Sequence, residues 1–385
     1  MTKRAKHVAV QRTRGMLKLV VTVGSLTIVG GCGKDDNSLH REQSDTAVAE
    51  RLMMTDEEKI SAGIARVLAQ GGEIERAEDL PDKPIIAVEL SLSSHLNDED
   101  LAFLSKLPHL RRLSLANFGR LKRLDYIQNL KELRELNMPR SGLWSEHLLY
   151  LWDLKALERL DLSKNYLSTP SGACPSLGLR PLAELTNLQV LSLEETRIND
   201  DDLKHLSALG SLSELDASDN RISDEGLSHL SGLVSLKVLD VSRNRISDKG
   251  LAHLRRLTQL EELYLVDTKI TGAGLEKLET LIRLRKLILY GAPVSGRGLA
   301  ALADLPNLRE LSLNDTEVSD ADLSHLLDLK TVESLYLQFT DVTDEGIQQL
   351  TLLPNLQRLD VGGTHVTAEG ISRLKSKRPE LTVID

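Results

Sequence analysis

Five residues in the carboxyl-terminal half share a spacing and a chemistry that suit non-covalent binding. They are Tyr264, Val266, Ile288, Tyr290 and Tyr336. Tyr264, Ile288 and Tyr336 are separated by 24 and 48 positions, and Val266 and Tyr290 by 24. Tyrosine combines a large apolar ring with a polar hydroxyl, and exposed apolar clusters often mark binding sites. The same residue types also favour β-strands for local reasons, so shielding by neighbours is the alternative.

Four histidines also recur at one position, namely His205, His229, His253 and His325. Stacked imidazoles can bind a metal or respond to pH. However, Lys277, Ala301 and Gln349 hold the same position in other copies, as simple duplication would produce. The Asp-rich turns nearby lack the spacing of an EF-hand loop and suit helix capping. We therefore expect no metal and no cofactor.

The sequence contains no phosphate-binding loop, zinc-ligand pair, nucleophile elbow or dinucleotide fingerprint. Cys174 has no histidine near it in the sequence, so a surface loop explains it better than a reactive thiol. We therefore expect a protein that binds without catalysis and has no small-molecule substrate.

The elements that must position these residues follow from one interval. Eight leucines recur every 24 residues: Leu191, Leu215, Leu239, Leu263, Leu287, Leu311, Leu335 and Leu359. With earlier and later copies there are thirteen strand phrases, which begin with Leu90 opposite Leu113 and end near Ile384. A fixed period of this size is typical of a solenoid.

Each copy has a simple physical logic. In Leu-x-Leu both leucines point inward and the residue between them points outward, because strand side chains alternate. Ser223 and Asp224 can cap the following helical piece, and Gly226 suits close packing there. Leucines spaced every three residues predict short or tight helices on the outer side.

This phase places the five candidate residues on the exposed surface of the sheet, beside Glu262 and Lys286. Asp161, Asp216 and Asp240 occupy outward positions on preceding copies. These carboxylates could steer a basic partner, or they could be ordinary solvated charges.

The copies resemble leucine-rich repeats of a bacterial 24-residue type. Thr often replaces the Asn of the repeat, at Thr196, Thr268, Thr316, Thr340 and Thr364, against Asn220 and Asn244. The resemblance covers residues 85–385 and implies an α/β fold, a curved solenoid with a parallel concave β-sheet and helices or 3-10 turns on the convex side. In this family the concave sheet usually recognises other proteins.

One interval departs from this 24-residue spacing. Leu160 and Leu191 are 31 residues apart, which predicts a loop insertion over residues 168–181. Trp144 and Trp152 fall on the outer half of the preceding repeat, where we expect them to pack beneath this loop rather than contact a ligand.

The amino terminus has the pattern of an export signal. Residues 1–31 hold six Lys or Arg and no acidic residue, and the uncharged apolar stretch from Leu19 to Val29 is too short for a membrane span of about 20 residues. Val29, Gly30, Gly31 and Cys32 then resemble the lipobox of bacterial lipoproteins. The resemblance implies cleavage after residue 31 and lipid attachment at Cys32; an ordinary signal peptide is the alternative.

The predicted domain order follows from these patterns. Residues 1–31 are a lipoprotein signal peptide, and the polar residues 32–54 are a flexible tether. Residues 55–84 form an N-terminal cap, in which Thr55 and Glu58 make a capping box, a helix follows, and strands are expected at residues 73–76 and 85–92. Residues 85–385 form the repeat domain.

The charge balance limits the partners. The chain has a formal net charge of -9, and removal of residues 1–31 would leave 42 basic against 57 acidic residues. This balance argues against nucleic acid as a partner. We expect an exported protein, lipid-anchored to a bacterial membrane on its periplasmic or outer surface, that binds another protein as a scaffold. The alternative is a structural envelope protein that binds cell-wall or surface polysaccharide through its tyrosines.

Overall fold

The computed structural model describes residues 19–22, 25–28, 54–91, 96–119, 121–168 and 177–385. Cys32 and Cys174 lie outside these residues, as do most of the predicted signal peptide and tether. The chain divides into two units, residues 1–59 and 60–385. In the first unit, β1 (Leu19–Thr22) pairs antiparallel with β2 (Ser25–Ile28), and the helix α2 (Asp56–Ala69) begins.

The second unit is built on one fourteen-stranded sheet, whose strands follow each other in space in the order of the sequence. β3 is antiparallel to β4, and every later pair is parallel. The strands are β3 Glu73–Arg76, β4 Ile85–Ser91, β5 Arg112–Ala116, β6 Glu135–Asn137, β7 Arg159–Asp161, β8 Val190–Ser192, β9 Glu214–Asp216, β10 Val238–Asp240, β11 Glu262–Tyr264, β12 Lys286–Ile288, β13 Glu310–Ser312, β14 Ser334–Tyr336, β15 Arg358–Asp360 and β16 Thr382–Ile384.

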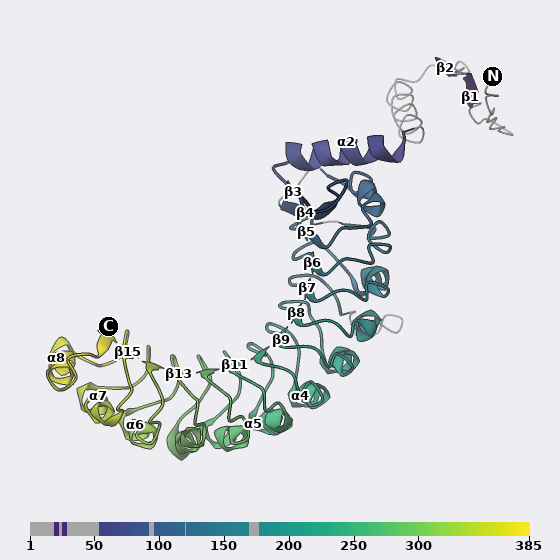
Figure 1. Ribbon diagram of the computed structural model, residues 1–385. Helices are drawn as coiled ribbons and strands as arrows, with labels where there is room; N and C mark the ends of the chain where they lie inside the picture. Colours follow the sequence, from purple (N-terminus) through teal and green to yellow (C-terminus); the bar gives the residue numbers. More distant parts are fainter. Residues whose placement is uncertain (1–18, 23–24, 29–53, 92–95, 120, 169–176) are drawn as a thin grey trace, which may run out of the picture. The chain divides into compact units, whose positions relative to one another are not determined.

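Short α- and 3-10 helices (η) connect the strands on the opposite, convex side (Figure 1). They are η1 Ala102–Lys106, η2 Ser145–Leu151, η3 Arg180–Glu184, α3 Asp200–Leu203, η4 Lys204–Leu206, α4 Asp224–Leu230, α5 Asp248–Leu251, η5 Ala252–Arg256, η6 Gly272–Leu278, η7 Gly296–Asp304, α6 Asp320–Leu323, η8 Ser324–Leu326, α7 Asp344–Gln349, η9 Leu350–Leu352 and α8 Ala368–Lys377. The predicted solenoid with strands on the concave side and tight helices on the convex side is confirmed.

The leucines that recur every 24 residues set the register of the strands. Leu239 lies opposite Leu215 on one side and Leu263 on the other, and all three are buried. The register differs from the prediction at both ends. Val88 rather than Leu90 pairs with Leu113, and Leu90 pairs with Leu115. Glu89 is therefore the neighbour of Ser114 in the sheet. At the last strand, Val383 rather than Ile384 lies opposite Leu359.

Buried side-chain amides connect successive repeats of the solenoid, each of which we call a rung. The Oδ1 of Asn220 accepts hydrogen bonds from the backbone N–H groups of Thr196 and Ile198 at 3.1 and 3.0 Å. Its Nδ2 donates to the carbonyl oxygen of Leu193 at 2.8 Å. Where Thr stands in this position its hydroxyl bonds within the repeat, as Thr268 donates to the carbonyl of Leu265, and Thr196 in addition contacts Asn220 of the next repeat. Both choices satisfy backbone groups that the turn would otherwise leave unpaired.

A second ladder runs along the convex side. The Asp that opens one helix accepts two hydrogen bonds from the N-cap residue of the next repeat: Asp224 accepts from the Ser247 backbone N–H at 2.7 Å and from its hydroxyl at 2.6 Å. A Cβ at Gly250 would lie 2.5 Å from that Asp224 oxygen. Glycine is therefore required there because the carboxylate of the preceding repeat fills the space.

This ladder is interrupted between η6 and η7. Gly272 stands at the position that Asp occupies in several other repeats, as does Gly296 in the next repeat, and the side chain of Ser295 makes no capping hydrogen bond. The two repeats instead touch through their backbones, because a Cβ at Gly298 would lie 1.7 Å from the carbonyl oxygen of Gly272.

Both ends of the array are covered in the described residues. Ile60 and Ile64 of α2 pack against the core, and Gly63 lies directly against the Phe103 ring. At the other end, Arg378 donates to the carbonyl oxygens of Leu353 and Leu356 at 2.7 and 2.9 Å. Within the described residues, no helix combines the length and apolarity needed to cross a bilayer.

Candidate interaction surface

The five predicted binding residues lie on three strands of the concave sheet and on the turns that follow two of them. Tyr264 of β11 pairs directly with Ile288 of β12. Val266 and Tyr290 lie two residues beyond these strands, where the Asp267 N–H donates to the Tyr290 carbonyl oxygen at 2.8 Å. Tyr336 belongs to β14. All five side chains are partly exposed, and they form what we call the tyrosine patch.

A small residue divides the tyrosine patch. Ser312 of β13 lies between Ile288 and Tyr336 in the register and is only 5% exposed. Beside it, Asn314 and Gln338 join their side chains by a 3.1 Å hydrogen bond. The patch is therefore two apolar areas on either side of a small polar residue.

Tyr264 is held in place by charged neighbours. Its hydroxyl donates to Glu262 at 2.6 Å, and the Lys286 ammonium lies 5.5 Å from the centre of its ring. Burial, together with the Glu262 hydrogen bond, raises the pKa of Tyr264 to about 12. Lys286 also pairs with Glu310 at 3.1 Å. Glu262 and Lys286, predicted to lie beside the patch, thus fix the orientation of its first ring.

The structure adds Phe339, which the sequence reasoning missed. Its side chain is 62% exposed, the highest value among the exposed large hydrophobic residues described. Its φ is 57°, in the left-handed region, which disfavours a bulky residue by about 1–2 kcal/mol. Aligning the repeats would have revealed it, because the same position holds Asp267, Asp315 and Gly363 elsewhere.

The predicted acidic residues have a local structural role. Asp161, Asp216 and Asp240 each accept a hydrogen bond from the backbone N–H two residues later, at 2.9, 3.0 and 2.8 Å. Asp216 and Asp240 also lie side by side on β9 and β10. Burial, together with repulsion from Asp216, raises the pKa of Asp240. The sequence analysis offered two alternatives for these carboxylates, steering of a basic partner or ordinary solvated charge. Neither alternative included their role in ending the strands.

The other singled-out residues stay apart from this surface. The four histidines lie partly exposed on the convex side, and no group of three potential metal ligands occurs within the described residues. Trp144 is not packed away as expected: it stacks on Tyr166 with ring centres 5.3 Å apart, and it remains 47% exposed. The residues at the end of the predicted insertion, Arg180 and Pro181, begin η3.

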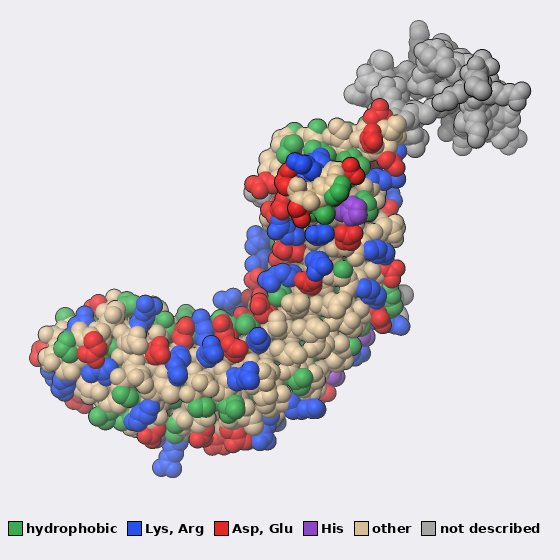
Figure 2. All heavy atoms as spheres, viewed as in Figure 1, with side chains coloured by type: hydrophobic (Ala, Val, Ile, Leu, Met, Phe, Trp, Pro, Cys, Tyr) green, Lys and Arg blue, Asp and Glu red, His purple; other side chains and the backbone are tan. Residues whose placement is uncertain are grey.

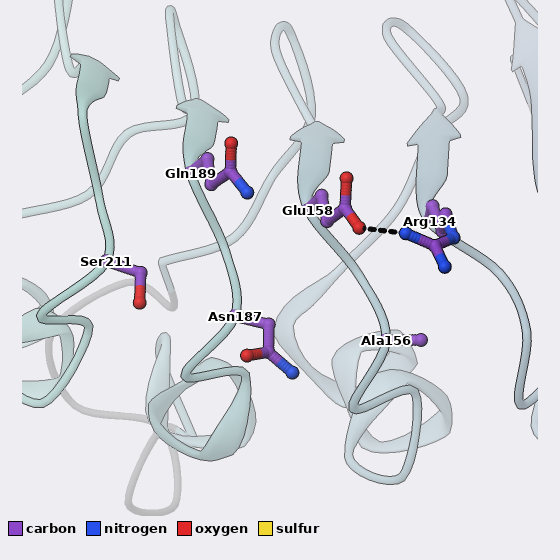
Figure 3. Close-up of a pocket in the computed structure, with 6 residues that line it drawn as sticks. All are labelled: Arg134, Ala156, Glu158, Asn187, Gln189 and Ser211. Carbon is purple, nitrogen blue, oxygen red and sulfur yellow. Dashed lines mark hydrogen bonds and ion pairs between the residues drawn. The ribbon is translucent and has the colours of Figure 1, made fainter.

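A polar groove of about 320 Å³ lies at the amino-terminal edge of the strands (Figure 3). Its lining residues are Arg134, Ala156, Glu158, Asn187, Gln189 and Ser211. Arg134 pairs with Glu158, and Asn187 donates to the Lys155 carbonyl oxygen at 2.8 Å. Because Arg134 and Glu158 neutralise each other, this edge of the sheet offers hydrogen-bonding groups rather than a charged site. Figure 2 shows basic and acidic side chains interspersed over the visible face.

Comparison with known proteins agrees with this architecture. Residues 211–231, 233–254, 328–350 and 353–375 match the family model described as Leucine Rich repeat. No curated protein matches the chain. The fold is thus a leucine-rich repeat solenoid, and four segments of the chain match the repeat model itself.

Two solved structures are similar to this solenoid. An internalin, InlF from Listeria monocytogenes, is 22% identical over 85% of this chain and 94% of its own, with a TM-score of 0.63. The ectodomain of the plant receptor kinase GASSHO1/SCHENGEN3 from Arabidopsis thaliana, in complex with CASPARIAN STRIP INTEGRITY FACTOR 2, is 19% identical over 81% of this chain and 40% of its own, with a TM-score of 0.52. At these identities the likeness shows the fold.

Proposed function

We propose that this protein is a non-catalytic scaffold that binds another protein through the concave sheet of its repeats. The observation that carries the proposal is the tyrosine patch, which places Tyr264, Tyr290 and Tyr336 partly exposed on a preformed sheet. A rigid surface needs little ordering on binding, and aromatic residues dominate protein interfaces. The plant ectodomain of similar fold, solved in a complex, supports the use of such a solenoid for recognition.

The proposal includes membrane attachment by lipid at Cys32. Its support is the sequence pattern, in which a basic segment, a short apolar stretch and Val29-Gly30-Gly31 precede the cysteine. More than one acyl chain is needed for stable anchoring, as lipoprotein processing supplies. The scaffold would then work at the surface of a bacterial membrane, periplasmic or external.

Cross-linked capture from an envelope lysate tests the binding proposal. We expect the full chain to capture a protein, and the triple variant Tyr264→Ala, Tyr290→Ala, Tyr336→Ala to lose it. Protease treatment of the lysate beforehand should abolish capture. Equal capture by the triple variant would refute the assignment of the concave surface.

The second candidate is polysaccharide binding, which the exposed Trp144–Tyr166 stack favours. Planar aromatic rings present apolar faces on which sugar rings can lie. A double variant, Trp144→Ala with Tyr166→Ala, separates the two functions. Capture that survives protease but fails in this double variant would establish the polysaccharide function.

Lipid attachment has its own test. Mass spectrometry of the mature amino terminus should show an acylated Cys32, and Cys32→Ala should leave the membrane fraction. Membrane retention of the Cys32→Ala variant would disprove the anchor without affecting the binding proposal.

A further inference from the structure

Phe339 occupies a position that the rest of the array gives to polar residues or glycine. The corresponding residues with positive φ include Asn117, Arg140, Lys164, Glu195, Asp219, Arg243, Asp267 and Asp315, together with Gly291 and Gly363. Asn, Asp and Gly tolerate the left-handed region well, and Phe does not. A strained, largely exposed ring is unfavourable for folding alone, and such strain gathers at functional sites.

The neighbouring rung is shaped to hold this ring. A Cβ at Gly363 would lie 2.5 Å from the Phe339 Cδ1, so the ring lies over a glycine that leaves it room. Phe339 follows Tyr336 by three residues, at the end of the same rung. The ring therefore extends the tyrosine patch outward, held by the backbone beneath it and open on its other side.

The net unmatched charge around the patch is negative. Arg243 is paired with Asp219 and Asp267, and Lys286 with Glu310. Arg358 on the adjacent β15 is the exposed exception, with no ion pair among the described residues. Four acidic residues lie on nearby strands and turns, and no described cation pairs with them: Glu214 and Asp216 on β9, Asp240 on β10, and Asp315 after β13. A partner that covers the apolar rings and the acids together must bring both apolar and basic groups.

We propose that Phe339 is the main anchor of the concave surface and that the partner is an extended, positively charged polypeptide segment carrying apolar side chains. The inference rests on the proposed protein-binding function and makes it specific. Apolar residues of the segment pack on Phe339, Tyr336 and Tyr290, and its Lys or Arg residues lie over Asp216 and Asp240. The hollow of a curved sheet fits a chain and excludes a flat bilayer.

A phage-displayed library of random twelve-residue peptides, selected on the full chain in detergent, tests the inference. We expect the enriched peptides to combine net positive charge with aromatic or aliphatic residues. Phe339→Asn should weaken their Kd by about tenfold or more, as loss of an aromatic anchor does. The same variant should keep or raise the thermal midpoint, because Asn suits the left-handed region.

Arg140→Asn is the matched control, because Arg140 is also exposed with a φ of 52° but lies on a distant rung. It should leave peptide binding unchanged, and it should also keep or raise the thermal midpoint, because Asn suits the left-handed region at both positions. A lower midpoint for Phe339→Asn would show that the ring serves stability, and unchanged peptide binding would remove it as the anchor. Either result overturns the inference.

The outcomes also separate this inference from the broader proposal. Peptides that lose affinity for the triple tyrosine variant but bind Phe339→Asn normally, or that are acidic, leave the concave binding function standing and refute the inference. Failure to enrich any peptide, or binding that ignores both variants, counts against both.

Discussion

At the residue scale, the carboxylate of Asp240 illustrates how a repeated position can serve folding and binding differently. Its Oδ1 terminates β10 by accepting the Ser242 N–H at 2.8 Å, a bond that needs an oxygen but not a charge. The negative charge lies partly buried beside Asp216. The charge therefore adds nothing that the strand end requires, and it is available for the proposed contact with a basic segment.

Asp240→Asn should raise the thermal midpoint at pH 7 and leave it unchanged at about pH 3. Burial raises the pKa of Asp240, so the protonated form favours the folded state. That contribution is fully present below the unfolded pKa of about 3.9 and is lost as the pH rises through the folded pKa. Asn removes the charge and keeps the acceptor oxygen. A midpoint that falls at pH 7, measured by circular dichroism, would contradict this reasoning.

At the scale of the elements, the convex ladder explains why short helices keep a regular spacing. Each Asp caps the next repeat, and each glycine leaves space for that Asp, as in the Asp224, Ser247 and Gly250 set. The ladder joins neighbours only, so its strength adds up along the array in the manner of a one-dimensional chain.

Gly250→Ala should destabilise the protein by about 1–3 kcal/mol, because the added methyl displaces Asp224 and breaks both of its bonds to Ser247. Better helix propensity of Ala offsets part of this, by about 1 kcal/mol at most. The free energy of unfolding in urea measures the difference. Gly210→Ala is the control, since nothing lies within 4 Å of its added Cβ, and it should be nearly neutral. Equal effects of the two variants would show that the ladder adds little.

The sequence reached most of these elements because their signals are local or strictly periodic. Alternating leucines place the strands, and the capping oxygen of Ser223 follows from its position before Asp224. The contact of Gly250 with Asp224 joins different repeats, so it becomes visible only when the rungs are stacked. The register of Leu90 was misjudged because β4 belongs to both the cap and the array.

The candidate surface was predictable in part for the same reason. Tyr264 and Ile288 lie at a strand position whose direction the leucine phase dictates. The sequence analysis missed Phe339 because its position follows the strand, where the chain turns and side chains no longer alternate between the two faces of the sheet. Its significance depends on φ, a quantity that hydrophobic patterning does not report.

At the scale of the whole molecule, the array depends on its covered ends. α8 and β16 bury Leu374 and Leu381, and Arg378 ties them to the preceding repeat. Without this cover, β15 would present an open edge and an apolar section to solvent.

A chain that ends at Thr367 should therefore unfold at a lower temperature than the full chain and should associate as its concentration rises. Light scattering and thermal scans measure both effects. A chain that begins at Met54 retains α2 with its Thr55 cap, and we expect its repeat domain to melt as in the full chain. An unchanged midpoint for the shortened carboxyl terminus would mean that the end cover is dispensable.

The backbone contact between Gly272 and Gly298 has a geometric consequence for the inner wall. The bend of a coil depends on how far apart successive turns stand on the outside compared with the inside. Where Asp224 or Asp248 opens a helix, its carboxylate lies between the outer turns, but here the backbones touch directly. We therefore expect the arc to straighten locally at β12, so that Ile288 and Tyr290 are presented on a broader and shallower floor than the acids of β9 and β10.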